Sequence, residues 1–416
     1  MKTRTIIEYV LAAIVVLVLG SLAGWYLFLR TQTETTVAQS IARGFGISIP
    51  EGSASGDTPD TPENAQAGTS AGQPVQRPAQ LWQVEEEPTA GHLFVGSGRN
   101  LRLRYVERAT GYVFEANPET GLRTRLTNTL LPKIYEALLS ENGHVFERSV
   151  DTFGNITTFA GTISTSTDSS DASSPAKTLL GSYLVKNILS MSTNPVSGAL
   201  FYVVESPNGG AVVSTEWNGQ KPKTLFESAI THWRPALMED GRTLLVQAAA
   251  DGVSGYGYEL RPDGTLSLLL GPVPGLVMRA RPSSKPGETA LLWSRSSRGE
   301  LRLFTRVDRN ATAAQIPVRT IADKCVWTSG KDLVAYCGVP QGSTGQNFLD
   351  NWYRGTAHSS DALWRIDASV GTAEMAYTPP SDTPVDIENI AIDRAGDYIT
   401  FTNAADKSLW LFRLAK

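Results

Sequence analysis

Residues 237–246 read LMEDGRTLLV, and this stretch decides the fold. An apolar start, a polar turn containing Gly241 and a run of apolar and β-branched residues predict two antiparallel strands joined by a tight turn. Five further copies of the pattern occur at residues 139–146, 191–203, 280–293, 326–336 and 392–401. Their turn glycines are Gly143, Gly198, Gly241, Gly287, Gly330 and Gly396, which lie 43 to 66 residues apart.

A second pattern follows the first in several copies. Residues 114–121 (FEANPETG) and 364–371 (WRIDASVG) share an aromatic residue, an apolar residue, Asn or Asp, and Gly at identical spacing, and residues 258–264 (YELRPDG) form a version one residue shorter. Asn, Asp, Pro and Gly are the residues that reverse turns use, so each stretch predicts a third strand that ends in a turn. Residues 122–126 and 265–270 are then expected to form fourth strands.

Four strands at a period of roughly 43 to 47 residues are typical of a β-propeller blade. One such sheet cannot cover its own faces, whereas radially stacked sheets bury both. With residues 93–129 as a further blade, we expect an all-β propeller of about seven blades, with six or eight as alternatives. The last strand, residues 409–414, ends almost at the C-terminus, so one blade is expected to take strands from both ends of the domain.

The composition agrees with many short strands. The 416 residues include 37 Gly and 23 Pro, and the charged fraction is 19%. The last value is below the roughly 25% usual for soluble domains. A formal net charge of −4 leaves no basic surplus for phosphate groups, so we expect no nucleic-acid partner.

On these motifs the chain resembles the TolB-like and WD-repeat-like propeller superfamily. The Asp- or Asn-containing turns and the Leu-Trp pairs at residues 363–364 and 409–410 carry the resemblance. The order of anchor, linker and propeller also resembles membrane-anchored propellers of candidate-phyla bacteria. Several turns lack a Pro-Asp-Gly core and no regular Trp-Asp blade ending occurs, and such motifs indicate fold rather than activity.

The N-terminus predicts a membrane anchor. Residues 9–29 carry no charge, Arg30 follows them, and Trp25 and Tyr26 suit the membrane interface. A cleaved signal peptide is the alternative, because residues 21–23 resemble a cleavage site. The excess of basic residues before the helix favours a cytoplasmic N-terminus and an extracytoplasmic propeller in the cell envelope.

Gly20 and Gly24 could allow weak pairing of two such helices, although small residues are common in membrane helices. We therefore divide the chain into a tip and helix (1–30), a disordered Ser/Thr/Gly/Pro linker (31–80) and the propeller (81–416). Residues 68–72 (GTSAG) match the nucleophile-elbow pattern, but no strand precedes them and no helix follows, so the match carries no function.

Cys325 and Cys337 flank the turn of one hairpin and are a candidate disulfide. A simple register places Cys337 opposite residue 324, so we expect a single bulge to bring the two cysteines together. The alternative is a pair of buried reduced thiols.

Two spacings exceed the blade period, and the excess predicts insertions. The first, about residues 161–177, is polar. The second, about residues 338–360, contains Phe348, Trp352, Tyr353 and Arg354, which are candidate partner-binding residues. The alternative is that these aromatic residues fold back onto their own blade.

The sequence predicts little chemistry. His92, His144, His232 and His358 are scattered over different repeats and match no metal-binding spacing. Asp361, Asp367 and Asp382 are interpreted as solvated turn acids, and we expect no catalytic residue, metal or cofactor.

Two functions remain open. The preferred one is a membrane-anchored extracytoplasmic scaffold that binds a protein or a glycan. The alternative is a hydrolase or lyase whose carboxylates converge on the central channel. Two acids and a histidine around a deep channel mouth would favour the enzyme, whereas an apolar mouth would favour binding.

Overall fold

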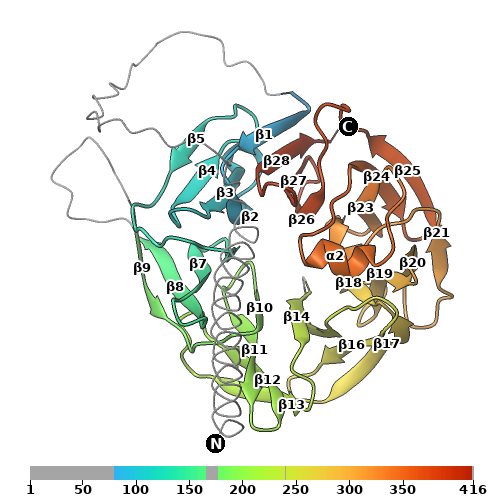
Figure 1. Cartoon of the computed structure of the whole chain (residues 1–416), viewed down its shortest axis with the longest axis horizontal. Helices are drawn as coiled ribbons and strands as arrows, with labels where there is room; N and C mark the ends of the chain where they lie inside the picture. Colours follow the sequence, from blue (N-terminus) through green and yellow to red (C-terminus); the bar gives the residue numbers. More distant parts are fainter. Residues whose placement is uncertain (1–78, 165–176, 239, 415–416) are drawn as a thin grey trace, which may run out of the picture. The chain divides into compact units, whose positions relative to one another are not determined.

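Each glycine-centred hairpin forms the first two strands of one four-stranded antiparallel sheet, and seven such sheets surround a central channel (Figure 1). The computed structural model describes residues 79–164, 177–238 and 240–414. The first strands of most neighbouring sheets contact one another, which places them innermost. The all-β, seven-bladed propeller expected from the repeat is therefore confirmed.

Blades 1 to 4 run consecutively along the chain. Their strands are β2 (Thr89–Val95), β3 (Arg102–Glu107), β4 (Val113–Ala116) and β5 (Arg123–Arg125); β6 (Glu136–Leu139), β7 (His144–Val150), β8 (Ile156–Ser164) and β9 (Thr178–Tyr183); β10 (Ser190–Thr193), β11 (Leu200–Ser206), β12 (Gly209–Thr215) and β13 (Lys223–Ser228); and β14 (Trp233–Leu237), β15 (Thr243–Gln247), β16 (Ser254–Leu260) and β17 (Leu266–Pro274). A short 3-10 helix, η1 (Gly98–Asn100), joins β2 to β3.

Blades 5 and 6 follow, and blade 6 holds an inserted helix. Their strands are β18 (Val277–Pro282), β19 (Thr289–Ser297), β20 (Glu300–Arg306) and β21 (Ala314–Ile316); then β22 (Cys325–Trp327), β23 (Val334–Pro340), β24 (Asp361–Asp367) and β25 (Thr372–Tyr377). The 3-10 helix η2 (Ala322–Lys324) precedes β22, and the α-helix α2 (Phe348–Tyr353) lies between β23 and β24.

Blade 7 closes the ring with strands from both ends of the domain. It contains β26 (Ile387–Ile392), β27 (Tyr398–Asn403), β28 (Leu409–Arg413) and, as its outer strand, β1 (Leu81–Glu85). Leu81 pairs with Phe412 and Trp82 with Leu411 in the antiparallel register. The predicted closure is thus confirmed, and separating the termini would remove a whole strand from a sheet.

The core is divided among the blade interfaces. Seven clusters of buried apolar residues exist, and each joins two neighbouring blades. Val84 of β1, for example, packs in the cluster that also contains Leu103 and Tyr105 of blade 1 and Leu411 of blade 7. Because both faces of every sheet are covered in this way, short strands suffice for a stable ring.

The turn glycines have a backbone reason to be there. Gly143, Gly198, Gly241, Gly287, Gly330 and Gly396 all have φ values between 70° and 104°, which side chains disfavour. The fourth strands differ from expectation in length, since β5 covers only Arg123–Arg125 and β17 extends to Pro274. The first polar insertion begins later than expected, because β8 continues to Ser164.

Several expectations concern residues that the structure does not describe. The helix at 9–29, the pair Gly20 and Gly24, the interface residues Trp25, Tyr26 and Arg30, linker residues 31–78 and residues 165–176 lie outside the described ranges. Within those ranges, no helix is both long enough and apolar enough to span a bilayer.

Candidate functional site at the channel mouths

The strand directions give the ring two faces. The hairpin face carries the turns between the first and second strands, including the six turn glycines. The α2 face carries the turns between the second and third strands, the connections between blades, and helix α2. Each face has one mouth of the central channel.

The mouth on the hairpin face is an apolar bowl of about 420 Å³. We call it the bowl; its floor and wall contain Leu93, Phe94, Val196, Leu237, Met238 and Ile392. These residues belong to blades 1, 3, 4 and 7, so no single blade could form the bowl. Val196 keeps 53% of its surface exposed at the mouth, so its side chain is accessible to a partner.

The rim of the bowl is polar. Glu141 of blade 2 pairs with Arg394 of blade 7 at 2.9 Å. Asn194 accepts hydrogen bonds from the backbone N–H groups of Val196 and Ser197, both at 2.9 Å, and so fixes the turn that presents Val196. An apolar floor within a hydrogen-bonding rim is suited to holding an apolar side chain of a partner.

Helix α2 shows where the candidate partner-binding residues lie. Phe348, Leu349 and Trp352 are buried in the cluster between blades 5 and 6, whereas Tyr353 is 40% exposed and Arg354 is exposed. Phe348 and Trp352 therefore fold back onto their own blade, as the alternative interpretation held. Only Tyr353 and Arg354 are accessible to a partner.

A buried ionic network lies beneath α2. The Lys324 Nζ atom, which is fully buried, donates to Asp361 Oδ2 at 2.6 Å, to Ser359 Oγ at 3.0 Å and to Asp386 Oδ1. It also lies 5.0 Å from the ring centroid of Trp352, whose indole N–H donates to Asp386 Oδ1 at 3.0 Å. A charged ammonium group can be buried only with such compensation.

The two carboxylates of this network have different electrostatics. Burial and the adjacent charge of Asp386 raise the pKa of Asp361, although Lys324 opposes this. Burial acts in the same direction on Asp386, but Lys324 and the hydrogen bonds from Trp352 and His358 lower the pKa of Asp386 overall. Lys324 therefore favours the ionised form of Asp386, whereas burial disfavours the ionised form of Asp361.

A second cluster ties α2 to blade 4. The Tyr353 hydroxyl donates to Asp323 Oδ2 at 2.7 Å, and Arg234 of β14 contacts the same oxygen at 2.6 Å. Burial opposes ionisation of Asp323, but Arg234 and Arg279 lower its pKa well below the usual range. Asp350 Oδ1 also accepts the backbone N–H of Asp251 at 2.9 Å. Helix α2 thus fastens blades 4, 6 and 7 to one another on this face.

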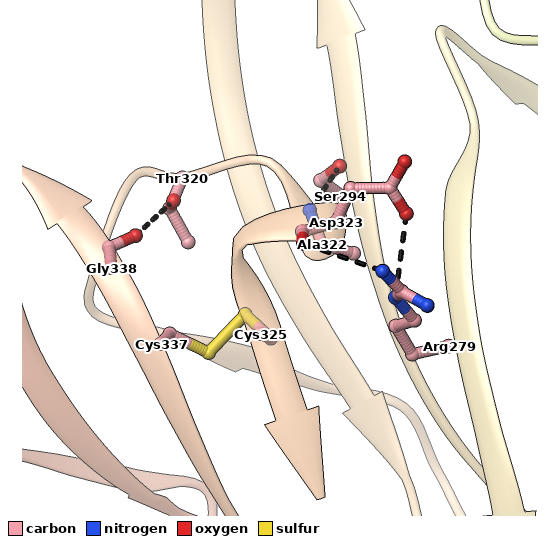
Figure 2. The surroundings of a disulfide bond; sticks show 8 residues. All are labelled: Arg279, Ser294, Thr320, Ala322, Asp323, Cys325, Cys337 and Gly338. Carbon is pink, nitrogen blue, oxygen red and sulfur yellow. Dashed lines mark hydrogen bonds and ion pairs between the residues drawn. A yellow bond between two sulfur atoms is a disulfide. The ribbon is translucent and has the colours of Figure 1, made fainter. Parts of the chain in front are cut away.

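The two cysteines are joined in a disulfide beside these clusters (Figure 2). Cys325 pairs directly with Cys337 in the register of β22 and β23, and their Cα atoms are 4.0 Å apart. The expected bulge is wrong, because the turn is one residue longer on the β23 side than a simple hairpin implies. Figure 2 also shows Asp323, two residues before Cys325, held by Arg279, so bond and cluster brace the same segment.

The acids and histidines are placed as follows. Asp361 is buried, so its interpretation as a solvated turn acid is wrong, whereas Asp382 is exposed and Asp367 accepts the backbone N–H of Ser369.

The four histidines lie in different surroundings. His358 Nδ1 lies 3.0 Å from Asp386 Oδ2. His144 stacks on Trp217, and His232 is exposed. Burial lowers the pKa of His92 to about 4. In the described ranges, no group of metal-ligating side chains comes together.

Sequence reasoning missed Lys324, Asp323 and Asp386. A weak signal exists: Lys324 and Asp386 directly precede the first strands β22 and β26, Asp323 lies one residue earlier than Lys324, and Asp386 stands between Val385 and Ile387. Charges at such positions are normally exposed in turns. Here the insertion that forms α2 covers them. The sequence shows the length of this insertion but not the course that its backbone takes.

No protein-family model and no curated protein sequence matches the chain. Solved structures do. A structure titled oligogalacturonate lyase in complex with manganese is similar with a TM-score of 0.51 at 9% identity, covering 83% of this chain and 95% of the other.

A chain of a mitotic checkpoint complex matches with a TM-score of 0.49 at 11% identity, over 88% of this chain and 100% of the other. Virginiamycin B lyase from Staphylococcus aureus matches with a TM-score of 0.47 at 12% identity, over 80% and 99%. At such identities the likeness concerns the fold alone, and the number of blades comes from the seven sheets of this chain's described residues.

Proposed function

We propose that this propeller is a binding scaffold that uses the bowl on its hairpin face to hold an apolar segment of a protein partner. The observation that carries the proposal is the composition of the bowl: six lining residues are apolar, Glu141 and Arg394 pair with each other, and Asn194 and Asp393 are used in turns. A catalytic mouth would instead need acids or bases directed at a substrate.

The alternative enzyme is less well supported by the geometry. Asp361, Asp386 and His358 do converge, as a hydrolase or lyase would require, but Lys324 and Trp352 already engage the acids under α2. Both acids are buried, so a substrate could reach them only if the covering segment moved aside, whereas the His358 side chain is 39% exposed. Lyase names among the structural neighbours are compatible with this alternative, yet those proteins resemble this chain in fold only.

We further propose that the ring stands outside the cytoplasm, tethered by residues 9–29, and belongs to the TolB-like and WD-repeat-like superfamily. The disulfide supports an oxidising compartment, because cytosolic proteins rarely keep such bonds. The uncharged run, with Trp25 and Tyr26 near its end and Arg30 directly after it, supports the anchor. The Asp- and Asn-containing turns support the superfamily.

Proximity labelling from the full chain in its native cell tests this proposal. We expect one extracytoplasmic partner to be enriched by the wild type and by Val253→Asp, and lost with Val196→Asp. Val253 is a matched control because it is 61% exposed in the turn between β15 and β16, on the opposite face. Enrichment of cytoplasmic proteins would contradict the location, and equal enrichment by both variants would contradict the bowl.

A further inference from the structure

A groove between blades 5 and 6 on the α2 face has no role in the proposal above. Its volume is about 680 Å³, and it lies between the β19–β20 turn, residues 317–319 after β21 and residues 341–344 after β23. A second hollow of about 310 Å³ shares the wall from Glu300 to Arg319 and extends toward Gln315. The two form one elongated, open groove rather than a closed pocket.

The groove is basic in a chain whose net charge is −4. It is lined by Arg298 and Arg319, and neither guanidinium group has a hydrogen-bond or ion-pair partner among the described residues. The single acid, Glu300, is already paired with Arg302 at 2.7 Å. Hydrogen bonding and charge from Arg302, with further attraction from Arg319 and Arg295, lower the pKa of Glu300. Two guanidinium groups without ion-pair partners thus line the groove, and their positive charges attract an anionic ligand.

The remaining lining suits a hydroxylated ligand. Gln341, Ser343 and Thr344 supply amide and hydroxyl groups along one wall, and Trp364 and Pro317 supply flat apolar surface. Planar guanidinium groups bind carboxylates with two parallel hydrogen bonds. Groups that bind carboxylates, groups that bind hydroxyls and a flat apolar surface thus occur together in one groove, which suits an acidic sugar chain better than an acidic peptide.

We propose that this groove binds an acidic saccharide chain, with Arg298 and Arg319 engaging sugar carboxylates and Trp364 lying against a sugar ring. The inference rests on the proposed function only in treating the ring as a binding module, because the bowl and the groove are on different faces. Binding of a glycan here and of a protein partner at the bowl would make the ring an adaptor between an acidic polysaccharide and a protein.

Titration calorimetry of the complete chain with alginate oligosaccharides tests the groove. We expect binding that weakens as salt is added, and that becomes about tenfold weaker with either Arg298→Gln or Arg319→Gln, since each loses a charge-assisted contact. Arg99→Gln removes the same charge from an exposed site near η1 and should leave affinity unchanged.

Two Gly→Phe variants distinguish blocking of the groove from loss of the fold. Gly342 lines the groove, Gly345 does not, and a Cβ atom at either position would meet nothing within 4 Å. Gly342→Phe should abolish alginate binding while Gly345→Phe retains it, with equal melting temperatures. Val196→Asp at the bowl should also retain it, so failure of the bowl proposal would be seen separately.

Three outcomes would overturn the inference. These are no binding of alginate, equal binding of neutral cello-oligosaccharides, and preferential binding of oligoglutamate, which would indicate an acidic protein ligand. Loss of binding by Gly345→Phe to the same degree as by Gly342→Phe would likewise contradict the assignment of the groove.

Discussion

Replacing Lys324 by Met should destabilise the ring strongly, because the Met side chain fits in volume but lacks the ammonium group that pairs with two buried carboxylates. The Nζ atom is fully buried and contacts Asp361, Asp386 and Ser359. Removing one partner of a buried ion pair costs about 3 to 5 kcal/mol, since the remaining charge is left unpaired in a region of low polarity.

The expected change in melting temperature follows from the size of the ring. An unfolding entropy of about 2.1 cal/mol/K per residue over roughly 340 residues gives about 0.7 kcal/mol/K. A loss of about 3 to 5 kcal/mol then lowers the melting temperature by about 4 to 7 °C. Differential scanning calorimetry of the variant and the wild type measures this shift.

The loss should depend on pH. In the wild type the folded-state pKa of Asp386 is lowered, so its stabilising contribution is present above its unfolded pKa and is lost as the pH falls. Without Lys324, burial remains as the largest opposing effect, so we expect the folded pKa of Asp386 to rise and the variant to lose stability relative to the wild type as the pH rises. The deficit of the variant should therefore be larger at neutral pH than in mild acid.

Two comparisons make the result specific. Lys285→Met removes a lysine that also pairs with an aspartate, Asp308, but its side chain is 65% exposed, so about 0 to 1 kcal/mol is expected. Adding Asp386→Asn to Lys324→Met removes the orphaned charge and should restore part of the stability. If Lys324→Met and Lys285→Met behave alike at all pH values, the ionic network does not hold this face together.

The remaining predictions concern three other features. Burial raises the pKa of Glu147 to about 8, so the wild type should lose stability as the pH rises from about 4.5 to 8. Glu147→Gln should remove this dependence of the melting temperature on pH, and an unchanged dependence would contradict the assignment. Val84 is 2% exposed in the closing strand β1, so Val84→Asp should lower the unfolding free energy by roughly 2 kcal/mol or more. Leu122→Asp, at a position 69% exposed, should not, and equal melting temperatures of the two variants would mean that β1 does not close the ring. Cys325 and Cys337 are 12 residues apart, so their joint replacement by Ala should lower the unfolding free energy by about 3 kcal/mol. Unreduced protein from the native cell should resist alkylation even when unfolded, and free thiols would argue against an oxidising compartment.

The sequence predicted the ring well because its information is local and repeated. Each turn needs a residue that accepts positive φ, and Gly241 with its five counterparts supplies that residue at blade spacing. Closure by β1 was also foreseeable, because the last strand would otherwise lack a partner. Strand ends were less predictable, as β17 shows, because its length depends on what β16 can pair with.

The site was predicted poorly because it depends on contacts between distant segments. The bowl takes Leu93 and Ile392 from sequence positions about 300 residues apart, and no local pattern marks either as a channel residue. The composition around Trp352 is typical of an interface anchor, but its side chain is buried, where the ring packs over Lys324 and the indole N–H donates to Asp386. The cysteine register failed by one residue because turn length cannot be counted from the flanking strands alone.

Photo-crosslinking from the bowl in the native cell tests the central claim that this ring is a binding module most directly. A photoreactive residue at Val196, on the hairpin face, should crosslink to one discrete extracytoplasmic protein, and the adduct should disappear when Leu237→Asp places a charge in the bowl wall. The same probe at Val253, on the α2 face, should not form that adduct. Equal crosslinking from both positions, or none from Val196, would contradict the account.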